Sequence, residues 1–250
     1  LPGDPDRTGR IAARFDSIEL RHRHREFASV TGTYRGQRVS VVSTGIGTDN
    51  VEIVLAEILA ITDRPTLIRV GSCGALQPGM ELGDLVISTG ALRLETTTRW
   101  FVDDGYPAYA HYEAVLALVE AAERLGKTHH LGVTATAPGF FGAQGRPVAH
   151  LPIRYPDLAD ELARQGVVNL EMEASAVLVL AALGGCRAGV VCAVYANRVT
   201  GEFVQGDDKD RAEASVVDTG LESLRILAEL DRQKRQAGAA RWRPSLWSPE

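Results

Sequence analysis

The sequence predicts a single α/β domain, arranged as three α/β/α layers with a mixed central sheet. Short β-rich runs alternate with segments of helical apolar spacing along the whole chain, a pattern typical of sheets covered by helices. A chain of 250 residues is also long enough to bury a sizeable core. Because no repeat divides it, we expect one domain over residues 1–236. The aperiodic tail at 237–250, with its Arg, Pro and Trp residues, suggests a mobile end.

In the first half of the chain, turn residues separate the expected elements. Arg35-Gly36 stands between two alternating runs, which predicts a β-hairpin. Thr48, Asp49 or Asn50 can cap a helix whose apolar residues recur at helical spacing. The expected elements are a helix at 8–14, hairpin strands at 27–34 and 37–43, a helix at 51–61, strands at 66–70 and 84–89, and a helix at 113–125.

The second half continues this alternation around a loop rich in proline and glycine at 138–147. An apolar run that follows two acidic residues predicts a buried helix. The expected elements are a strand at 130–137, a short helix at 157–164, a strand at 168–170, a helix at 174–183, a strand at 187–194 and a C-terminal helix at 210–233.

Composition and charge exclude several classes of protein. The net charge is −5 and the body of the chain has no Lys/Arg-rich tract, so nucleic acid is not an expected partner. No apolar run reaches the roughly 20 residues that span a membrane. Cys73, Cys186 and Cys192 are odd in number and lack CxxC spacing, which fits a reducing cytoplasm and no zinc site. The chain starts without a methionine or a signal pattern, so we expect further residues before Leu1.

Two carboxylates, Glu171 and Glu173, stand inside an otherwise buried segment. Spaced by two, they would point to the same side of an extended strand. A buried carboxylate needs a partner, and one at the mouth of an apolar pocket is suited to accept both hydroxyl hydrogens of a vicinal diol such as that of ribose. From these residues alone, a solvated strand end or an internal salt bridge explains the pair equally well.

Four loops carry groups suited to ligand binding, since loops at strand ends form the crevice of open α/β sheets. Residues 3–7 combine a glycine with Arg7, and residues 69–74 combine glycines with Arg69 and the Ser72 hydroxyl, which suits an anion. Residues 140–146 offer a phenyl ring for stacking, and Gln and Arg for one edge of a flat base. Residues 195–198 end a strand. Each loop alone is as readily an ordinary turn, but Arg69 closes an apolar run and there needs an anionic partner.

Taken together and in this order, these stretches resemble the nucleoside phosphorylase-I family, and within it the uridine phosphorylases. The resemblance covers most of the chain, and the spacing of Phe140, Gln144 and Arg146 resembles a uracil pocket most specifically. The matching stretches are LPGDPDR at 1–7, HREF at 24–27, STGIG at 43–47, RVGSCGAL at 69–76, GFFGAQGR at 139–146, NLEMEAS at 169–175 and NR at 197–198.

This resemblance implies a role for each matching residue. Phosphate would be held by Gly3, Arg7, Arg69 and Ser72, with Arg25 supplied by a neighbouring subunit. The base would be held by Phe140, Gln144, Arg146, Tyr195 and Arg198, and the ribose by Glu171, Met172 and Glu173. Catalysis would rest on Arg69, Glu173, Gln144 and Arg146. The implied assembly is a homodimer as the minimal unit, within a homohexamer.

The resemblance also implies the chemistry. Phosphate would attack C1′ of uridine, giving uracil and ribose 1-phosphate, with inorganic phosphate as co-substrate and no required cofactor. A potassium ion between subunits is left open, since Glu26 and Ile46 match its ligands whereas Asn50 replaces a serine. The partners would be small molecules, with no membrane or nucleic acid.

One difference from relatives argues against purine cleavage, whereas departures at Ser72 and Tyr195 leave alternatives open. Purine-cleaving relatives carry an aspartate near the strand at 187–194, where this chain has Asn197, which cannot act as a general acid. Ser72 replaces a threonine, and Tyr195 replaces an aliphatic residue at the far side of the base. The alternatives are a phosphorylase of broader or purine specificity and a non-catalytic nucleoside-binding protein of the same fold.

Overall fold

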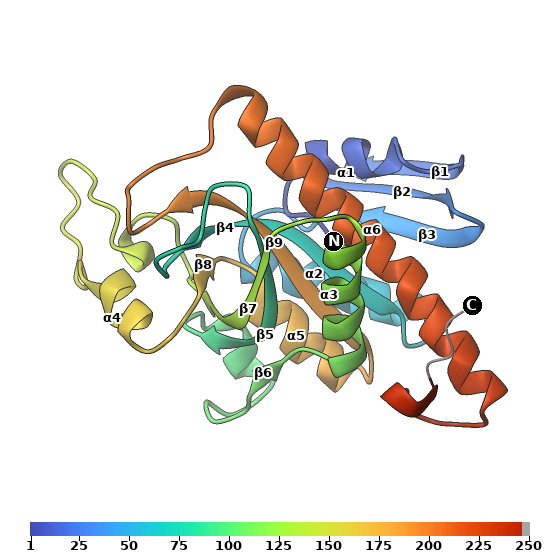
Figure 1. The fold of residues 1–250 in the computed structure, drawn as a ribbon. Coiled ribbons are helices and arrows are strands. Elements are labelled where there is room, and N and C mark those ends of the chain that lie inside the picture. Colours follow the sequence, from blue (N-terminus) through green and yellow to red (C-terminus); the bar gives the residue numbers. More distant parts are fainter. Residues whose placement is uncertain (247–250) are drawn as a thin grey trace.

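The computed structural model describes residues 1–246 and contains a six-stranded sheet, a three-stranded sheet and the helices that cover them (Figure 1). The strands are β1 Ser17–His24, β2 Phe27–Tyr34, β3 Gln37–Val42, β4 Thr66–Ala75, β5 Leu85–Arg93, β6 Ala108–Tyr109, β7 His129–Thr136, β8 Asn169–Glu171 and β9 Arg187–Asn197. The helices are α1 Pro5–Ala12, α2 Thr48–Ile61, α3 Tyr112–Arg124, α4 Leu158–Arg164, α5 Ala174–Leu183 and α6 Gly206–Gln236, with 3-10 turns η1 Thr97–Trp100, η2 Gly142–Gln144 and η3 Pro244–Leu246.

The larger sheet is mixed, as expected, and has the order β6-β5-β7-β8-β4-β9. β4 runs parallel to β9 and β5 parallel to β7, whereas β8 pairs with β4 in the antiparallel sense. β5 also pairs with β9, so that β5, β7, β8, β4 and β9 close into a ring of strands, and β6 pairs with β5 outside this ring. The local patterns of the sequence do not encode this closure, because it joins segments about a hundred residues apart.

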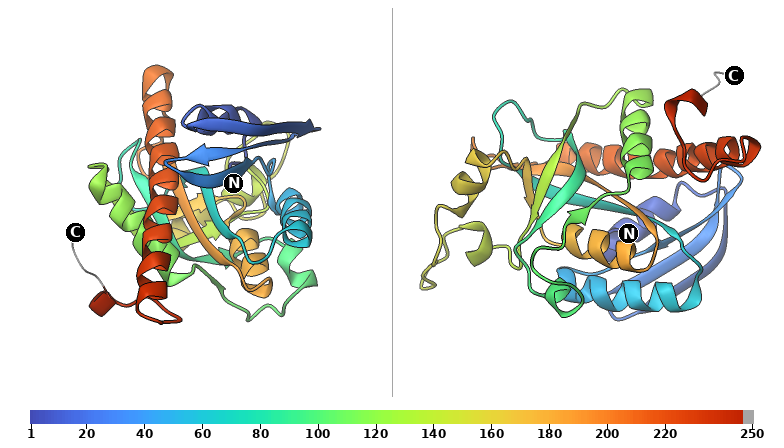
Figure 2. Two further views of the ribbon diagram at one scale, coloured as in Figure 1. Left: turned by 90° about the vertical axis from the view of Figure 1, so that its right-hand side faces the viewer. Right: turned by 90° about the horizontal axis from the view of Figure 1, so that it is seen from below.

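Alternating side chains along the central strands face two different cores. Val191 and Ala193 of β9 pack with α3 and α6, whereas Val190, Cys192 and Val194 pack with α2 and α5. The right-hand view of Figure 2 shows these two pairs of helices on opposite sides of the strands. The expected three-layer arrangement is therefore confirmed.

The smaller sheet, β1-β2-β3, contains a strand that the sequence patterns did not predict. β2 and β3 form the expected hairpin, and β1 adds to its free edge, with Arg23 opposite Ala28. Every residue of β1 is exposed, so its segment lacks the one-sided apolar alternation that marks a half-buried strand. Arg25 lies in the tight turn between β1 and β2 with φ of 55°.

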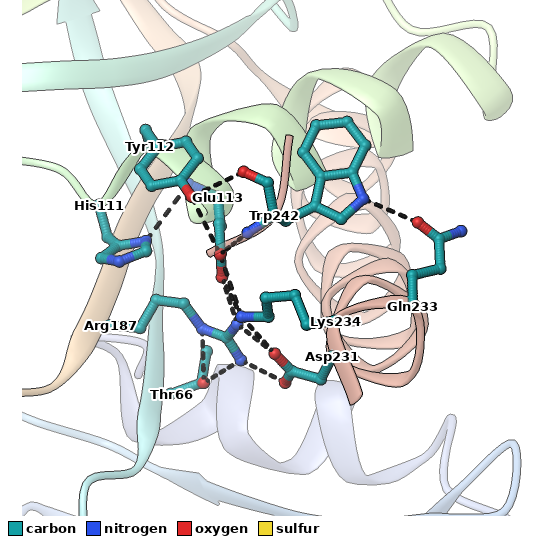
Figure 3. A network of polar contacts seen from close by, with 9 residues as sticks. All are labelled: Thr66, His111, Tyr112, Glu113, Arg187, Asp231, Gln233, Lys234 and Trp242. Carbon is teal, nitrogen blue, oxygen red and sulfur yellow. Dashed lines mark hydrogen bonds and ion pairs between the residues drawn. The ribbon is translucent and has the colours of Figure 1, made fainter. Parts of the chain in front are cut away.

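The end of α6 is tied to α3 and β9 by a set of buried and half-buried polar side chains, here called the Glu113 network (Figure 3). The Glu113 carboxylate accepts hydrogen bonds from Lys234 Nζ at 2.8 and 3.0 Å, Arg187 NH1 at 2.8 Å and the Trp242 backbone N–H at 3.0 Å. Trp242 also donates its indole N–H to Gln233 at 2.7 Å. The first residues of the expected tail are thus docked on the domain, and residues 247–250 lie outside the described part of the chain. No helix within residues 1–246 is long and apolar enough to cross a membrane.

Candidate functional site

A cavity of about 730 Å³ lies where β4, β8 and β9 end and α1, α5 and α6 begin. It brings together residues from every loop that the sequence singled out. The predicted site residues that line it are Gly3, Arg7, Arg69, Ser72, Phe140, Gln144, Arg146, Glu171, Met172, Glu173 and Tyr195, and the potassium candidates Glu26, Ile46 and Asn50 line it as well. Arg25 and Arg198 do not line it.

Arg69, Glu171 and Glu173 form a buried charged group, here called the Arg69 cluster. Arg69 donates from Nε to Glu171 at 3.1 Å and from NH2 to Glu173. Burial opposes the charge on Arg69, but Glu173 and Glu171 raise its pKa above the ordinary arginine value. Gly71 makes room for the Arg69 guanidinium, since a Cβ at position 71 would lie 2.8 Å from Arg69 NH2. The internal salt bridge that the sequence left open is therefore present, and the two carboxylates do face the same partner.

The two carboxylates of this cluster differ in how many hydrogen bonds they already accept. Glu171 accepts from the Thr136 hydroxyl at 2.6 Å, from the backbone N–H groups of Glu173 and Ala174 at 2.8 Å each, and from Arg69. Its oxygens thus cap the start of α5 and fix Arg69. Glu173 accepts from the Gly47 N–H at 2.6 Å and from Arg69, which leaves more of its acceptor capacity free. Burial raises the pKa of Glu173, against the pull of Arg69.

One end of the cavity is suited to an anion. Arg69 NH1 is buried and has no hydrogen-bond partner, and it lies 3.9 Å from where a Cβ on Gly3 would stand. Arg7 is 5% exposed and donates from Nε to Glu213 at 2.9 Å and from NH1 to the Val70 carbonyl at 3.2 Å. A buried guanidinium N–H without a partner costs free energy unless a ligand accepts from it.

Another group of lining residues combines aromatic rings with a second unpaired arginine. The guanidinium carbon of Arg146 lies 4.4 Å from the ring centre of Phe140 and 5.1 Å from that of Phe203. Its Nε is buried without a partner, and burial together with the charge of Arg198 lowers the pKa of Arg146 to about 10. Gln144 is 3% exposed, and its backbone carbonyl accepts from Arg198 at 2.9 Å. These rings and donors suit a flat polar ring.

Asn197, Asn50 and Tyr195 make contacts that the sequence did not predict. Asn197 donates to the Met80 carbonyl at 2.8 Å and accepts from the N–H groups of Val199 and Thr200, so its amide holds a loop. Asn50 donates to the Ile46 carbonyl at 3.0 Å. The Tyr195 hydroxyl accepts from Arg7 NH2 at 3.4 Å, at the anion end of the cavity.

Sequence reasoning missed Phe203 and Lys209, which also line the cavity. Phe203 belongs to the segment between β9 and α6, and it reaches the site because it forms a β-bridge with Ala196. Neither residue lies in one of the motifs or loops that the sequence singled out. The signal that could have found Phe203 is an aromatic residue five positions beyond the strand-end loop at 195–198.

Known proteins resemble this chain over most of its length. A family model described as the phosphorylase superfamily matches residues 1–228. A uridine phosphorylase from Thermococcus kodakarensis is 46% identical over 248 residues, which cover 98% of this chain and 87% of that protein. A guanosine phosphorylase from Halorubrum lacusprofundi is 34% identical over 90% of this chain and 89% of its own. A Trypanosoma brucei nucleoside phosphorylase, described as showing uridine phosphorylase activity, superimposes with a TM-score of 0.82 at 28% identity, over 89% of this chain and 91% of that one.

Proposed function

The chain belongs to the phosphorylase superfamily, and from this membership we propose that it is a pentosyltransferase that converts uridine and phosphate reversibly to uracil and ribose 1-phosphate. The observation that carries the proposal is a single cavity with unpaired buried guanidinium donors on Arg69 and Arg146. A phosphate at the first and a pyrimidine at the second would satisfy both.

The proposed reaction needs no protein nucleophile. Phosphate held by Gly3, Arg7, Arg69 and Ser72 attacks C1′ as the C1′–N1 bond breaks, and the bonding electrons leave with uracil. Gln144 and Arg146 donate hydrogen bonds to the uracil oxygens, where negative charge develops. Arg198, bonded to the Gln144 carbonyl, supports this loop from outside the cavity.

Glu173 is the proposed acceptor for the ribose hydroxyls, with Met172 against the sugar. Glu171 is better suited to a positioning role, because four donors already occupy its oxygens. No cofactor other than phosphate enters the proposal. A potassium ion between subunits would use Glu26 and Ile46, and the Ile46 carbonyl, which accepts from the Asn50 amide nitrogen at 3.0 Å, has one further lone pair for it.

Uracil release from uridine tests the proposal directly. It should require phosphate and yield ribose 1-phosphate, detected by chromatography or by coupled phosphate consumption. Free ribose would indicate a hydrolase, and binding of uridine without turnover would indicate a nucleoside-binding protein. Either result would overturn the proposed function.

The base preference is the point on which relatives differ, since a guanosine phosphorylase is also similar to this chain. We expect uridine to be preferred over inosine or guanosine by at least about a hundredfold, because a site built on specific hydrogen bonds rejects ligands that leave them unpaired. The Asn197 amide, bound to the Met80 carbonyl, supports this expectation, since no acid stands there to protonate a purine. Comparable turnover of inosine or guanosine would favour the purine alternative.

A shared active site is proposed for the dimer, because Arg25 is exposed and does not line the cavity of its own chain. In an isologous dimer, each site would use Glu173 of one chain and Arg25 of the other. Arg25→Ala and Glu173→Ala should each be nearly inactive. Mixing the two after dissociation should restore about a quarter of all sites, since half the dimers are hybrids and each hybrid has one intact site. No recovery, with hybrids seen by native mass spectrometry, would exclude sharing.

A further inference from the structure

Tyr195 lies at the anion end of the cavity, although the family resemblance implied a place beside the base. Its hydroxyl oxygen is 3.4 Å from Arg7 NH2, and the guanidinium carbon of Arg7 lies 5.9 Å from the centre of its ring. The side chain is half-buried and lines the cavity together with Gly3 and Ser72. A ligand bound beside Arg7 would therefore lie next to this phenol.

The hydroxyl of Tyr195 has a hydrogen to offer. A phenol donates one hydrogen bond and can accept as well. Within residues 1–246, Arg7 is its hydrogen-bond partner, and toward Arg7 it can act only as acceptor. Burial raises the pKa of Tyr195 above its ordinary value, so the proton stays on the oxygen at neutral pH. The free O–H is thus a neutral donor at the edge of the cavity.

The charges at this end explain why a neutral donor matters. Arg7 Nε is bonded to Glu213 at 2.9 Å, and the second Glu213 oxygen binds Arg10 at 2.8 Å. Arg69 likewise faces two carboxylates. Much of the positive charge that would attract a phosphate dianion is therefore already offset by buried acids. Additional hydrogen-bond donors must stabilise the dianion, and bonds to charged acceptors are stronger than neutral ones.

We propose that Tyr195 is a phosphate-binding residue, which donates its hydroxyl hydrogen to the phosphate co-substrate while accepting from Arg7. The proposal rests on the proposed phosphorolysis and adds a recognition element that the motifs of the family do not supply. The phenol would link Arg7 to the bound anion and so fix the orientation of the Arg7 guanidinium.

Kinetics of Tyr195→Phe test the assignment, with Tyr34→Phe as the matched control because Tyr34 is half-buried in the hairpin away from the cavity. We expect the phosphate KM of Tyr195→Phe to rise about tenfold, the scale of one hydrogen bond to a charged group. The uridine KM at saturating phosphate should stay within about twofold, and Tyr34→Phe should change neither. A rise in the uridine KM alone would mean that Tyr195 contacts the base and not the phosphate. No change in either KM would mean that the Tyr195 hydroxyl contacts neither ligand. Failure of the proposed function is distinguishable, since the unmodified enzyme would then form no ribose 1-phosphate from uridine and phosphate.

A second variant separates direct contact from positioning of Arg7. Incorporation of 3-fluorotyrosine at position 195 makes the hydroxyl a better donor and a poorer acceptor. At a pH where the phenol stays protonated, calorimetric titration with inorganic phosphate alone should give equal or tighter binding. Weaker binding would mean that Tyr195 acts through Arg7, and it would overturn the direct contact.

Discussion

The Glu113 network and the Arg69 cluster are both built on buried charges, but they differ in how completely those charges are satisfied. Glu113 accepts from Lys234, Arg187 and Trp242. Within residues 1–246, five buried side-chain nitrogen or oxygen atoms have no partner, and none belongs to the Glu113 network, whereas Arg69 NH1 and Arg146 Nε both belong to the cavity. A complete network serves the fold, and an incomplete one at strand ends marks a ligand site.

The two regions also differ in what surrounds them. The Glu113 network joins α3, β9 and α6, elements that already pack against one another, so its bonds add to contacts made by the core. The Arg69 cluster links the interior of β4 to the end of β8, and its three residues line the cavity, where a guanidinium can reach a ligand. Substitutions should therefore separate stability from activity.

The largest effect is expected for Arg69→Ala. Removing a desolvated anion partner should cost roughly 2–5 kcal/mol of transition-state stabilisation, or about thirtyfold to several thousandfold in kcat/KM. Steady-state assays with uridine and phosphate measure this loss, and circular dichroism checks that the variant is folded. A folded variant with nearly normal kcat/KM would contradict the assignment of the cavity.

Glu113→Ala should behave in the opposite way. It leaves Lys234 and Arg187 short of an acid and should lower the free energy of unfolding by about 3 kcal/mol, as expected when one partner of a buried ion pair is removed. The kcat/KM of the folded fraction should stay within about twofold. Urea titration and kinetics on the same preparation measure both, and a selective loss of activity would mean that the two regions are coupled.

Acid titration sharpens the same comparison. Burial alone would raise the pKa of Glu113, but hydrogen bonds from Lys234, Trp242 and Arg187 lower it to about 2 from the ordinary 4.5. A carboxyl with a lowered folded-state pKa stabilises the fold above its unfolded pKa, and this stability is lost as the pH falls from about 4.5 toward 2. Over that range, wild-type stability should fall more steeply than that of Glu113→Gln, by at most about 1.4 kcal/mol per pH unit. Equal slopes would show that Glu113 binds a proton equally in both states.

Gln144→Ala tests the aromatic part of the cavity. The loss of one hydrogen bond to an oxygen that gains charge should lower kcat/KM for uridine by roughly 1.5–3 kcal/mol, or about ten- to a hundredfold. Phosphate affinity, measured by calorimetry without nucleoside, should be unchanged because Arg69 and Arg7 remain in place. An equal loss of phosphate affinity would show that the cavity does not have two separate subsites.

The smallest effect is expected for Trp242→Phe, which removes the indole hydrogen bond to Gln233 but keeps an aromatic ring at this position. The free energy of unfolding should fall by about 1 kcal/mol, the usual net value of one hydrogen bond, with no change in kcat. Thermal unfolding monitored by circular dichroism measures it. A loss of activity would reveal an influence of the docked C-terminal segment on the site.

Sequence patterns predicted the alternating core elements well, because their apolar spacing is local. Ala174–Leu183 of α5 was predicted with its observed ends, and the apolar run there is bounded by Glu173 and Gly184. β4 was predicted too short, since glycines at its end were taken for a turn although Gly71 and Gly74 pair with β9. β1 escaped notice because both of its faces are exposed.

Motifs predicted most of the residues that line the cavity, but they did not predict which of these residues contact one another. Arg69 was predicted to need an acid, but its pairing with Glu171 and Glu173 spans more than a hundred residues. Lys234 and Glu113 are 121 residues apart, and nothing in either local sequence points to the other. Such contacts depend on the ring of strands and on helix packing, which single-sequence patterns do not encode.

The amide of Asn197 has a consequence for how this protein can evolve. Its N–H binds the Met80 carbonyl and its oxygen binds two backbone N–H groups, so an aspartate there would lose one bond and set an anionic oxygen against a carbonyl. A single mutation toward purine cleavage at this position would thus begin with a loss of about 1–3 kcal/mol of stability. A stabilising substitution elsewhere that came first would offset this loss and open the step to natural selection.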